Sequence, residues 1–426
     1  MTAPDWLAYL DLFADEPLWI DGRGPWTRGE VATAIRERAR SQAVGQRVPL
    51  TPEPTREGLI ELLAVLAGGG TAVLLPRREP ASRRRELAAA VRSEEGPPGQ
   101  VWVRTSGTMG RARWLVHTPW TLITAAEAAA TRVGFGRGGV WRMSLPMDHV
   151  GGLSLLWRAL VGGGAVATDD APVAVTHCSL VPTQLHRAVV EGTTDRWRDL
   201  RCLLIGGAPL PAPLRQRALE AGLPLTVSYG LTETGAFVAA SLPGDPLLAE
   251  PDYAGRPLWP SRTAVAADGE ILLAVPSLGV GRADDQGRLS PLELDGEGWL
   301  RTGDLGRLDR DALHVSGRRD NLIVSGGEKL AAEELEAALL ELPGVRAAVV
   351  VPLRDPEYGQ RPVAFLDPDA AARWTSGSLA DALAGRIARW KLPIRVEPLP
   401  VDGFKPDRAA LRTLAEGSAP DRWSGD

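Results

Sequence analysis

Residues 200–230, LRCLLIGGAPLPAPLRQRALEAGLPLTVSYG, contain the pattern that decides the fold. The apolar run RCLLI predicts a buried strand, PAPLRQRALEAG predicts a helix, and PLTVSY predicts a second strand. Two strands joined by a helix of this length are typical of a parallel βαβ unit, whose strands are buried on both faces. Ligands of such sheets bind where loops leave the carboxyl ends of the strands.

The same alternation extends back to about residue 56, for example in REGLIELLAVLAGG and TAVLLP, and in GGLSLLWRALVGG and AVAT. After about residue 250, short segments rich in Gly and Pro predict a β-rich subdomain, and a strand, a helix and another strand follow HVSGRRDN. The predicted fold class is therefore α/β. A large N-terminal domain of βαβ layers with a β-rich subdomain (1–316) precedes a small, mobile α+β C-terminal domain (317–426).

The composition excludes several classes of function. The net charge is −5, with acidic and basic residues mixed along all 426 residues, so no basic field is available for nucleic acid. Neither a signal peptide nor an apolar run of about 18 residues is present, so we expect a cytoplasmic protein with no membrane span. Cys178 and Cys202 lie in apolar runs typical of buried thiols, and the sequence contains no zinc-binding motif.

Residues 101–113, VWVRTSGTMGRAR, contain a candidate anion-binding loop. Glycines let backbone N–H groups surround an anion, and the hydroxyls of the TSGT run add donors for phosphate oxygens. The spacing differs from that of the P-loop, and a plain surface turn is the alternative.

Three further segments carry polar side chains suited to a nucleotide. SYGLTETGA (228–236) contributes Glu233, a plausible Mg²⁺ ligand. LRTGDLGRLD (300–309) sets Asp304 in a predicted Gly-flanked turn, where it suits ribose hydroxyls or, alternatively, an Asx-turn. SGRRDN contributes Arg318, which suits ribose or phosphate oxygens.

Taken in this order, the segments resemble the motifs of the adenylate-forming superfamily of acyl-CoA synthetases, adenylation domains and luciferases. The resemblance runs from about residue 100 to the end, and Met109, Ala112, Arg113 and Ala332 depart from the usual residues. It implies an ATP- and AMP-binding set of Thr105, Ser106, Gly107, Thr108, Gly110, Gly206, Gly207, Ala208, Pro209, Ser228, Tyr229, Gly230, Thr232, Asp304 and Arg318.

The C-terminal segment WKLPIRVEPLPVDGFKPDRAALR resembles the KxP…GKxxR ending of the superfamily. Only three of the 48 basic residues are lysines (Lys329, Lys391 and Lys405), and two of them fall on family lysine positions. The resemblance implies that Lys405 is the catalytic lysine of adenylation, although Phe404 replaces the usual glycine. It also implies a hinge at Asp320 and a coenzyme A (CoA) tunnel wall formed by a strand carrying Gly326 and Gly327.

SLPMDHVGGLSLLWRALVGGGAVA (144–167), SLVPTQLHRAV and LLIGGAPLP resemble segments of o-succinylbenzoate–CoA ligases of menaquinone and phylloquinone synthesis. The resemblance implies an acyl site at His149, Gly151 and Arg158, with His149 also catalytic, while Asp148 replaces an aromatic residue. An arginine in an apolar acyl site is costly unless the substrate carries a second anion. The alternatives are that Arg158 is a solvated helix residue and that His149 is a packed structural histidine.

The sequence thus predicts a Mg²⁺-dependent ligase that uses ATP and CoA to convert o-succinylbenzoate into o-succinylbenzoyl-CoA, AMP and pyrophosphate. The alternatives are another aryl- or acyl-CoA ligase and a stand-alone adenylation enzyme that loads a carrier protein. A non-catalytic nucleotide-binding relative is a weaker alternative, and nothing supports luciferase chemistry. The oligomeric state stays open, a homodimer included.

Overall fold

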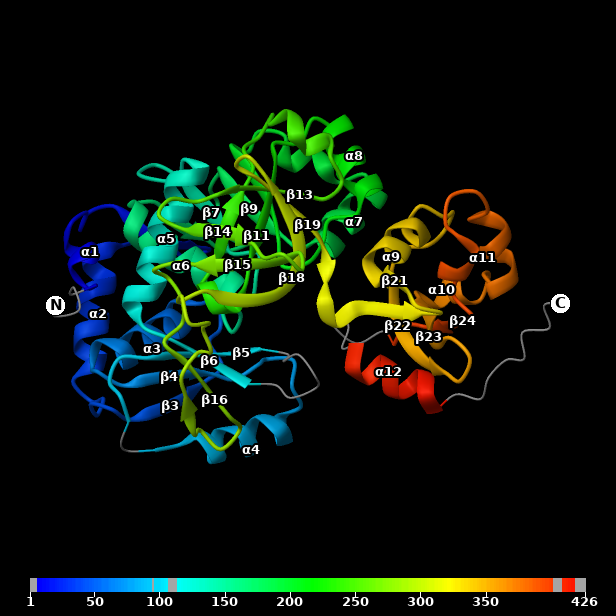
Figure 1. Cartoon of the computed structure of the whole chain (residues 1–426). Coiled ribbons are helices and arrows are strands. Elements are labelled where there is room, and N and C mark those ends of the chain that lie inside the picture. Colours follow the sequence, from blue (N-terminus) through cyan, green and yellow to red (C-terminus); the bar gives the residue numbers. More distant parts are fainter. Residues whose placement is uncertain (1–5, 94–95, 106–112, 401–407, 418–426) are drawn as a thin grey trace.

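The computed structural model describes residues 6–93, 96–105, 113–400 and 408–417. Its strands form three sheets, of 13, six and five strands. The first two make up the larger body in Figure 1, and the third lies to one side with the chain after Leu322. Sheets and helices together make an α/β fold, as predicted.

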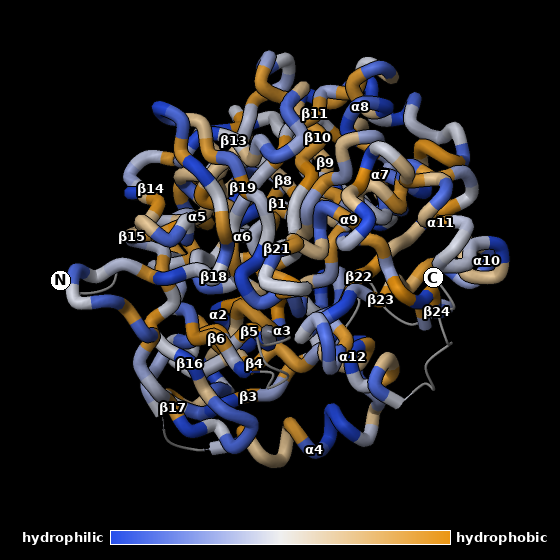
Figure 2. The backbone as a smooth tube through the Cα atoms, turned by 45° about the vertical axis from the view of Figure 1, so that its right-hand side comes forward, coloured by the Kyte–Doolittle hydropathy of each residue, from blue (hydrophilic) through white to orange (hydrophobic). Residues whose placement is uncertain are grey.

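The largest sheet has the order β14-β15-β18-β19-β13-β12-β11-β10-β9-β7-β8-β1-β2. Its strands are β1 Pro17–Asp21, β2 Gly24–Thr27, β7 Val140–Arg142, β8 Ala165–Ala167, β9 His177–Leu180, β10 Cys202–Ile205, β11 Leu225–Gly230, β12 Phe237–Ala240, β13 Tyr253–Pro257, β14 Arg262–Val265, β15 Glu270–Ala274, β18 Leu300–Asp309 and β19 Ala312–Arg318. Strand β10 pairs in parallel with both β9 and β11, as the alternating sequence pattern predicts. Every residue of β9 and β10 is buried, and β10, which consists of apolar residues alone, has the hydrophobic colour in Figure 2.

The region predicted as a β-rich subdomain does not form a sheet of its own. Strands β13, β14, β15, β18 and β19 extend the largest sheet in antiparallel fashion beyond β12. Because pairing satisfies the backbone groups of an edge strand, this addition extends the sheet rather than leaving β12 exposed.

The second sheet has the order β17-β16-β6-β5-β4-β3. Its strands are β3 Arg47–Leu50, β4 Thr71–Leu74, β5 Val101–Thr105, β6 Arg113–His117, β16 Gly281–Ala283 and β17 Leu289–Ser290. Strands β5 and β6 are antiparallel, and Thr105 pairs with Arg113. The two ends of the candidate anion-binding loop therefore lie side by side.

Helices fill the space between and around these sheets. The larger body contains α1 Ala8–Asp11, α2 Arg28–Ala39, α3 Arg56–Ala67, α4 Ala81–Val91, α5 Pro119–Val133, α6 Val150–Gly162, α7 Pro182–Val190 and α8 Ala212–Glu220, with the short turns η2 Thr194–Trp197, η3 Thr232–Thr234, η4 Pro246–Ala249 and η5 Arg319–Asn321. The main core joins apolar residues of α3, α5 and α6 to Val103 of β5 and Leu204 of β10, so it lies between the two sheets. Burial of this apolar surface is the dominant stabilising contribution.

The chain after η5 builds the third sheet, in the order β21-β20-β23-β22 with β24 beside β23. Its elements are β20 Leu322–Ser325, β21 Glu328–Ala331, α9 Ala332–Leu340, β22 Ala348–Asp355, β23 Gly359–Leu366, α10 Pro368–Ala371, α11 Ser376–Ala382, η6 Arg389–Lys391, β24 Arg395–Pro398 and α12 Arg408–Gly417. Helix α9 packs on one face through Leu335 and Val350, and α12 packs on the other through Leu411 and Val351. Each face of this sheet therefore has its own core.

The N-terminal hairpin of β1 and β2 was not predicted. Strand β1 pairs in parallel with β8, and Arg28 beside the hairpin is fully buried. Its guanidinium donates to the carbonyl oxygens of Leu160 and Gly164 at 3.0 and 2.8 Å. Burial of this cation is offset by these charge-assisted bonds.

Cys178 and Cys202 are buried free thiols, as predicted, and burial raises the pKa of each to about 11. Among the described residues, no helix is both long and apolar enough to cross a membrane.

Candidate functional site

Predicted nucleotide-binding residues follow the carboxyl ends of neighbouring parallel strands. Gly206 to Pro209 come directly after β10, and Ser228 to Gly230 end β11. The two strand ends are in close contact, because a Cβ on Gly206 would lie 2.6 Å from the Ser228 Oγ. That hydroxyl donates to the Ile205 carbonyl oxygen at 3.1 Å. The parallel register thus brings the two predicted segments to one edge of the sheet.

Asp304 lies inside β18, so the predicted Gly-flanked turn and the alternative Asx-turn are both wrong at this position. The antiparallel partner β19 continues the ladder and sets Asp304 opposite Arg318. The Tyr229 hydroxyl donates to Asp304 Oδ2 at 2.7 Å, and Arg318 Nη1 donates to Oδ1 at 2.7 Å. Burial raises the pKa of Asp304, while the Arg318 charge opposes that rise. The three side chains form one fixed, polar group at the sheet edge.

Glu233 lies in η3, directly after β11. Its carboxylate Oε1 lies 3.3 Å from Arg282 Nη2, and its carbonyl accepts from the Gly279 N–H at 2.8 Å. A cleft of about 380 Å³ is lined by Glu233, Arg282, Thr302, Gly303, Arg318 and Asp320, among others. A half-buried carboxylate with one long contact can accept Mg²⁺, a cation that prefers oxygen ligands. The donor chemistry therefore fits the predicted metal.

Arg158 is 2 % exposed, which rules out the alternative of a solvated helix residue. The guanidinium carbon lies 4.8 Å from the ring centroids of both Trp141 and Phe237. Nη2 donates to Ser154 Oγ at 2.9 Å, while Nε and Nη1 have no partner among the described residues. Burial lowers the pKa of Arg158 to about 9, so the group remains cationic at neutral pH. Two unpaired nitrogen donors on a buried cation favour an anionic ligand.

His149 and Gly151 lie at the start of α6. His149 is the N-cap and is exposed, which rules out the alternative of a packed structural histidine. Gly152 allows close backbone contact, because a Cβ there would overlap the Pro146 carbonyl. Asp148 is buried, and its Oδ2 accepts from the Arg77 N–H at 2.8 Å. Asp148 therefore fixes the loop that leads to His149.

Several predicted site residues lie outside the described residues: Ser106, Gly107, Thr108, Gly110 and Lys405. Thr105 is described and ends β5, where its Oγ1 donates to the Arg113 carbonyl at 3.2 Å. Thr232 begins η3, and its carbonyl accepts a hydrogen bond from the buried His117 ring at 2.7 Å.

Gly326 and Gly327 form the turn that follows β20 and leads into β21. Their φ angles of +59° and +87° lie in the left-handed region, which glycine adopts at least cost. Asp320 lies in η5, between the last strand of the largest sheet and the first strand of the third. Its carbonyl accepts from Arg412 Nη2 of α12 at 2.9 Å.

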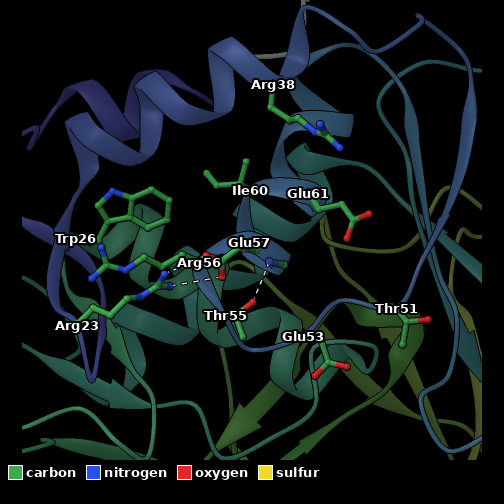
Figure 3. A pocket seen from close by; sticks show the side chains of 11 residues that line it. Arg23, Trp26, Arg38, Thr51, Glu53, Thr55, Arg56, Glu57, Ile60 and Glu61 are labelled. Carbon is green, nitrogen blue, oxygen red and sulfur yellow. Dashed lines mark hydrogen bonds and ion pairs between the residues drawn. The ribbon is translucent and has the colours of Figure 1, made fainter.

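Another cavity, of about 660 Å³, lies beside β2 and α3 and is lined by none of the predicted site residues (Figure 3). Arg56 lies over the Trp26 ring at 5.2 Å and is paired with Asp21, and Arg23 is paired with Glu57. Arg38 and Glu61 also line this cavity, so its wall carries charges of both signs.

Sequence reasoning missed Ser154, Trp141, Phe237, Arg282 and His117. Arg282 lies 49 positions from Glu233, and Phe237 lies far from Arg158 in the chain, so no local pattern joins either pair. The spacing of Ser154 and Arg158 was a usable signal, because side chains four apart on a helix face meet.

A family model described as AMP-binding enzyme matches residues 101–280, and one described as AMP-binding enzyme C-terminal domain matches residues 334–403. The 2-succinylbenzoate–CoA ligase of Salmonella typhimurium is 35% identical over 318 residues, which cover 72% of this chain and 67% of the relative. That of Bacillus cereus (strain ATCC 14579) is 32% identical over 342 residues, which cover 74% of this chain and 70% of the relative.

Solved structures with a similar fold belong to the same group of enzymes as these relatives. The o-succinylbenzoate CoA synthetase (MenE) of Bacillus subtilis in complex with the acyl-adenylate intermediate OSB-AMP has a TM-score of 0.82 at 25% identity, covering 98% of this chain and 99% of that chain. A variant of E. coli MenE with bound OSB-AMS has a TM-score of 0.81 at 26% identity, covering 98% and 99%. The resemblance predicted from the sequence motifs is confirmed. The chain belongs to the AMP-binding enzyme family and, within it, to the group of the 2-succinylbenzoate–CoA ligases.

Proposed function

We propose that the protein joins 2-succinylbenzoate (o-succinylbenzoate) to CoA at the expense of ATP, through an acyl-adenylate, as a step of menaquinone biosynthesis. The observation that carries the substrate assignment is the buried Arg158, whose Nε and Nη1 have no partner among the described residues and whose guanidinium lies over the Trp141 and Phe237 rings. The substrate has two carboxylates, of which one is activated and the other remains an anion. A cation in an apolar site stabilises that second anion. When a monocarboxylate binds instead, the buried cation is left without a partner.

In the first step, an oxygen of the succinyl carboxylate attacks the α-phosphorus of ATP. The bond from that phosphorus to the bridging oxygen breaks, and pyrophosphate leaves with the electron pair. Asp304, held by Tyr229 and Arg318, would accept hydrogen bonds from the ribose hydroxyls and orient the nucleotide. Glu233 would hold Mg²⁺, which offsets charge on the phosphate oxygens when bound. Lys405 is proposed to donate to the α-phosphate and the attacking carboxylate, a stabilisation that usually dominates such transfers.

In the second step, the CoA thiolate attacks the acyl carbonyl carbon, and AMP leaves with the electrons of the carbon–oxygen bond. We propose that residues 1–316 and 317–426 act as two domains and that the chain pivots at Asp320. The location of Asp320 in η5, between two sheets, supports a pivot there. The Gly326–Gly327 turn is proposed to approach CoA, since both glycines are exposed and lack side chains that would exclude it. A cytoplasmic location fits the two free thiols.

The test is release of AMP from ATP in the presence of CoA. 2-Succinylbenzoate is compared with benzoate, 4-hydroxybenzoate and a medium-chain fatty acid. Preference for 2-succinylbenzoate is expected. Turnover of another acid alone would keep the adenylate mechanism and refute the substrate. AMP formation that needs a carrier protein instead of CoA would favour the carrier-loading alternative, and no AMP with any acid would refute the activity.

A further inference from the structure

Arg282 lies in the nucleotide cleft and has an incomplete set of contacts. It belongs to β16, and its guanidinium reaches Glu233 through one contact of 3.3 Å. The two side chains are 24% and 22% exposed, so both can be reached from the cleft that they line. A single long contact at partial exposure contributes little to stability.

The other arginines of the cleft have closer partners. Arg318 Nη1 lies 2.7 Å from Asp304, and Arg301 pairs with Glu270 and with Asp268. Among the described residues, the Arg282 side chain has no recorded partner other than Glu233. Arg282 is therefore the cleft cation that can change partner at least cost.

Binding of Mg²⁺ to Glu233 would compete with Arg282 for the same carboxylate. A divalent cation and a guanidinium repel each other at one oxygen, so the guanidinium must turn to another anion. The triphosphate that accompanies the metal supplies such an anion, and a guanidinium binds phosphate oxygens through two parallel N–H groups.

The strand register brings Arg282 toward the predicted phosphate end of the cleft. Arg282 pairs with Leu115 on β6, two residues from Arg113, which pairs with Thr105 on β5. The Gly279 N–H, at the start of the same segment, donates to the Glu233 carbonyl at 2.8 Å. Arg282 thus contacts the carboxylate proposed to hold Mg²⁺ and lies on the strand next to β6, which begins at Arg113.

We propose that Arg282 is a binding residue for the β- and γ-phosphates of ATP, which exchanges Glu233 for the polyphosphate when Mg²⁺·ATP enters. This inference rests on the proposed function, because it requires ATP in this cleft. AMP lacks the two outer phosphates, so Arg282 distinguishes ATP from AMP.

The test is calorimetric titration of the full chain with ATP and with AMP, each in the presence of Mg²⁺. R282Q is expected to lower the affinity for ATP about tenfold and to leave that for AMP unchanged, while R282K recovers part of the ATP affinity. Arg288→Gln is the matched control, since Arg288 is 77% exposed on the same hairpin and pairs with Asp284 outside the cleft.

Three outcomes would overturn the inference: equal losses for ATP and AMP, unchanged affinity for both, or tighter ATP binding by R282Q. Tighter binding would mean that Arg282 merely competes with Mg²⁺. If the wild-type chain bound no ATP, the proposed function would fail together with the inference. If the wild-type chain binds ATP and R282Q binds ATP with the same affinity, the role of Arg282 is refuted and the proposed function is not.

Discussion

Arg158 is the side chain that we propose sets substrate choice. Its guanidinium carbon lies over the rings of both Trp141 and Phe237, and its Nε and Nη1 are buried without a partner among the described residues. Cation–π contacts stabilise a buried guanidinium by about 2 kcal/mol but leave its hydrogen-bonding groups unsatisfied. An anion that reaches these two nitrogens completes the hydrogen bonding of the buried cation.

R158M keeps most of the volume of Arg158 and removes its charge. We expect KM for 2-succinylbenzoate to rise about 100-fold, because a buried charge-assisted bond contributes about 3 kcal/mol. Activity with a simple benzoate, however low, should not fall. Steady-state AMP release with both acids checks this, and equal losses for the two acids would assign Arg158 a structural role.

The contact between Tyr229 and Asp304 is a second residue-scale test. Y229F leaves Asp304 Oδ2 buried without its 2.7 Å donor, so the carboxylate loses its fixed orientation toward ribose. We expect AMP affinity to fall about tenfold, which corresponds to loss of about 1.4 kcal/mol. Y253F is the control, because Tyr253 also donates to a carboxylate, Asp245, at 2.7 Å. Equal loss of AMP affinity in both variants would contradict the prediction.

At the scale of elements, the sequence predicted what depends on local pattern. The alternation from about residue 56 to 230 predicted β4, β7 to β11 and the helices α3, α5, α6 and α8, because their periodicity is local. The N-terminal hairpin was missed because β1 obtains its place from β8, more than a hundred residues away. Asp304 was predicted in a turn because Gly303 and Gly306 flank it, whereas pairing with β19 overrides that signal.

The candidate site divides in the same way. Motifs predicted Glu233, Tyr229, Asp304, Arg318 and Arg158, which the fold gathers along the large sheet and its helices. The rings beside Arg158 were not predictable, since Trp141 and Phe237 come from β7 and β12, whereas Ser154 lies one turn earlier on the same helix, α6. Sequence motifs name the reacting groups, and tertiary packing determines their electrostatic environment.

The β20–β21 hairpin allows a test of the CoA proposal. A Cβ on Gly327 would meet nothing within 4 Å, so G327A adds a methyl group without a clash and strains only the φ of +87°. We expect conversion of preformed acyl-AMP by CoA to slow about tenfold, while ATP–pyrophosphate exchange is preserved. Gly385, with φ +75° and equally open space, gives the matched variant G385A. A similar loss in both variants would indicate strain rather than contact with CoA.

For the whole molecule, the segment between the sheets is held from both sides. Arg319 Nη2 lies 2.8 Å from Asp268 of the larger body, and Arg412 of α12 donates to the Asp320 carbonyl at 2.9 Å. Any rotation about Asp320 must exchange at least one of these contacts. Because both are exposed polar contacts of modest strength, the segment can be ordered in one orientation and still allow another.

Acid stability is a property of the whole chain to which we expect two buried histidines to contribute. Burial lowers the pKa of His117 and that of His177 to about 4, below the ordinary value of 6.5. Between those values the unfolded chain binds more protons than the folded chain, so stability falls as the pH decreases. From pH 7 to pH 5 each histidine should cost roughly 2 kcal/mol of unfolding free energy.

His117→Gln retains a donor for the Thr232 carbonyl and removes the titrating ring. The unfolding free energy that this variant loses between pH 7 and pH 5 should therefore be smaller than the wild-type loss by about that amount. Urea unfolding followed by tryptophan fluorescence at both pH values measures the difference, and His177→Gln repeats the test at an independent site. Parallel pH dependence in the wild type and both variants would show that burial of these rings does not control acid stability.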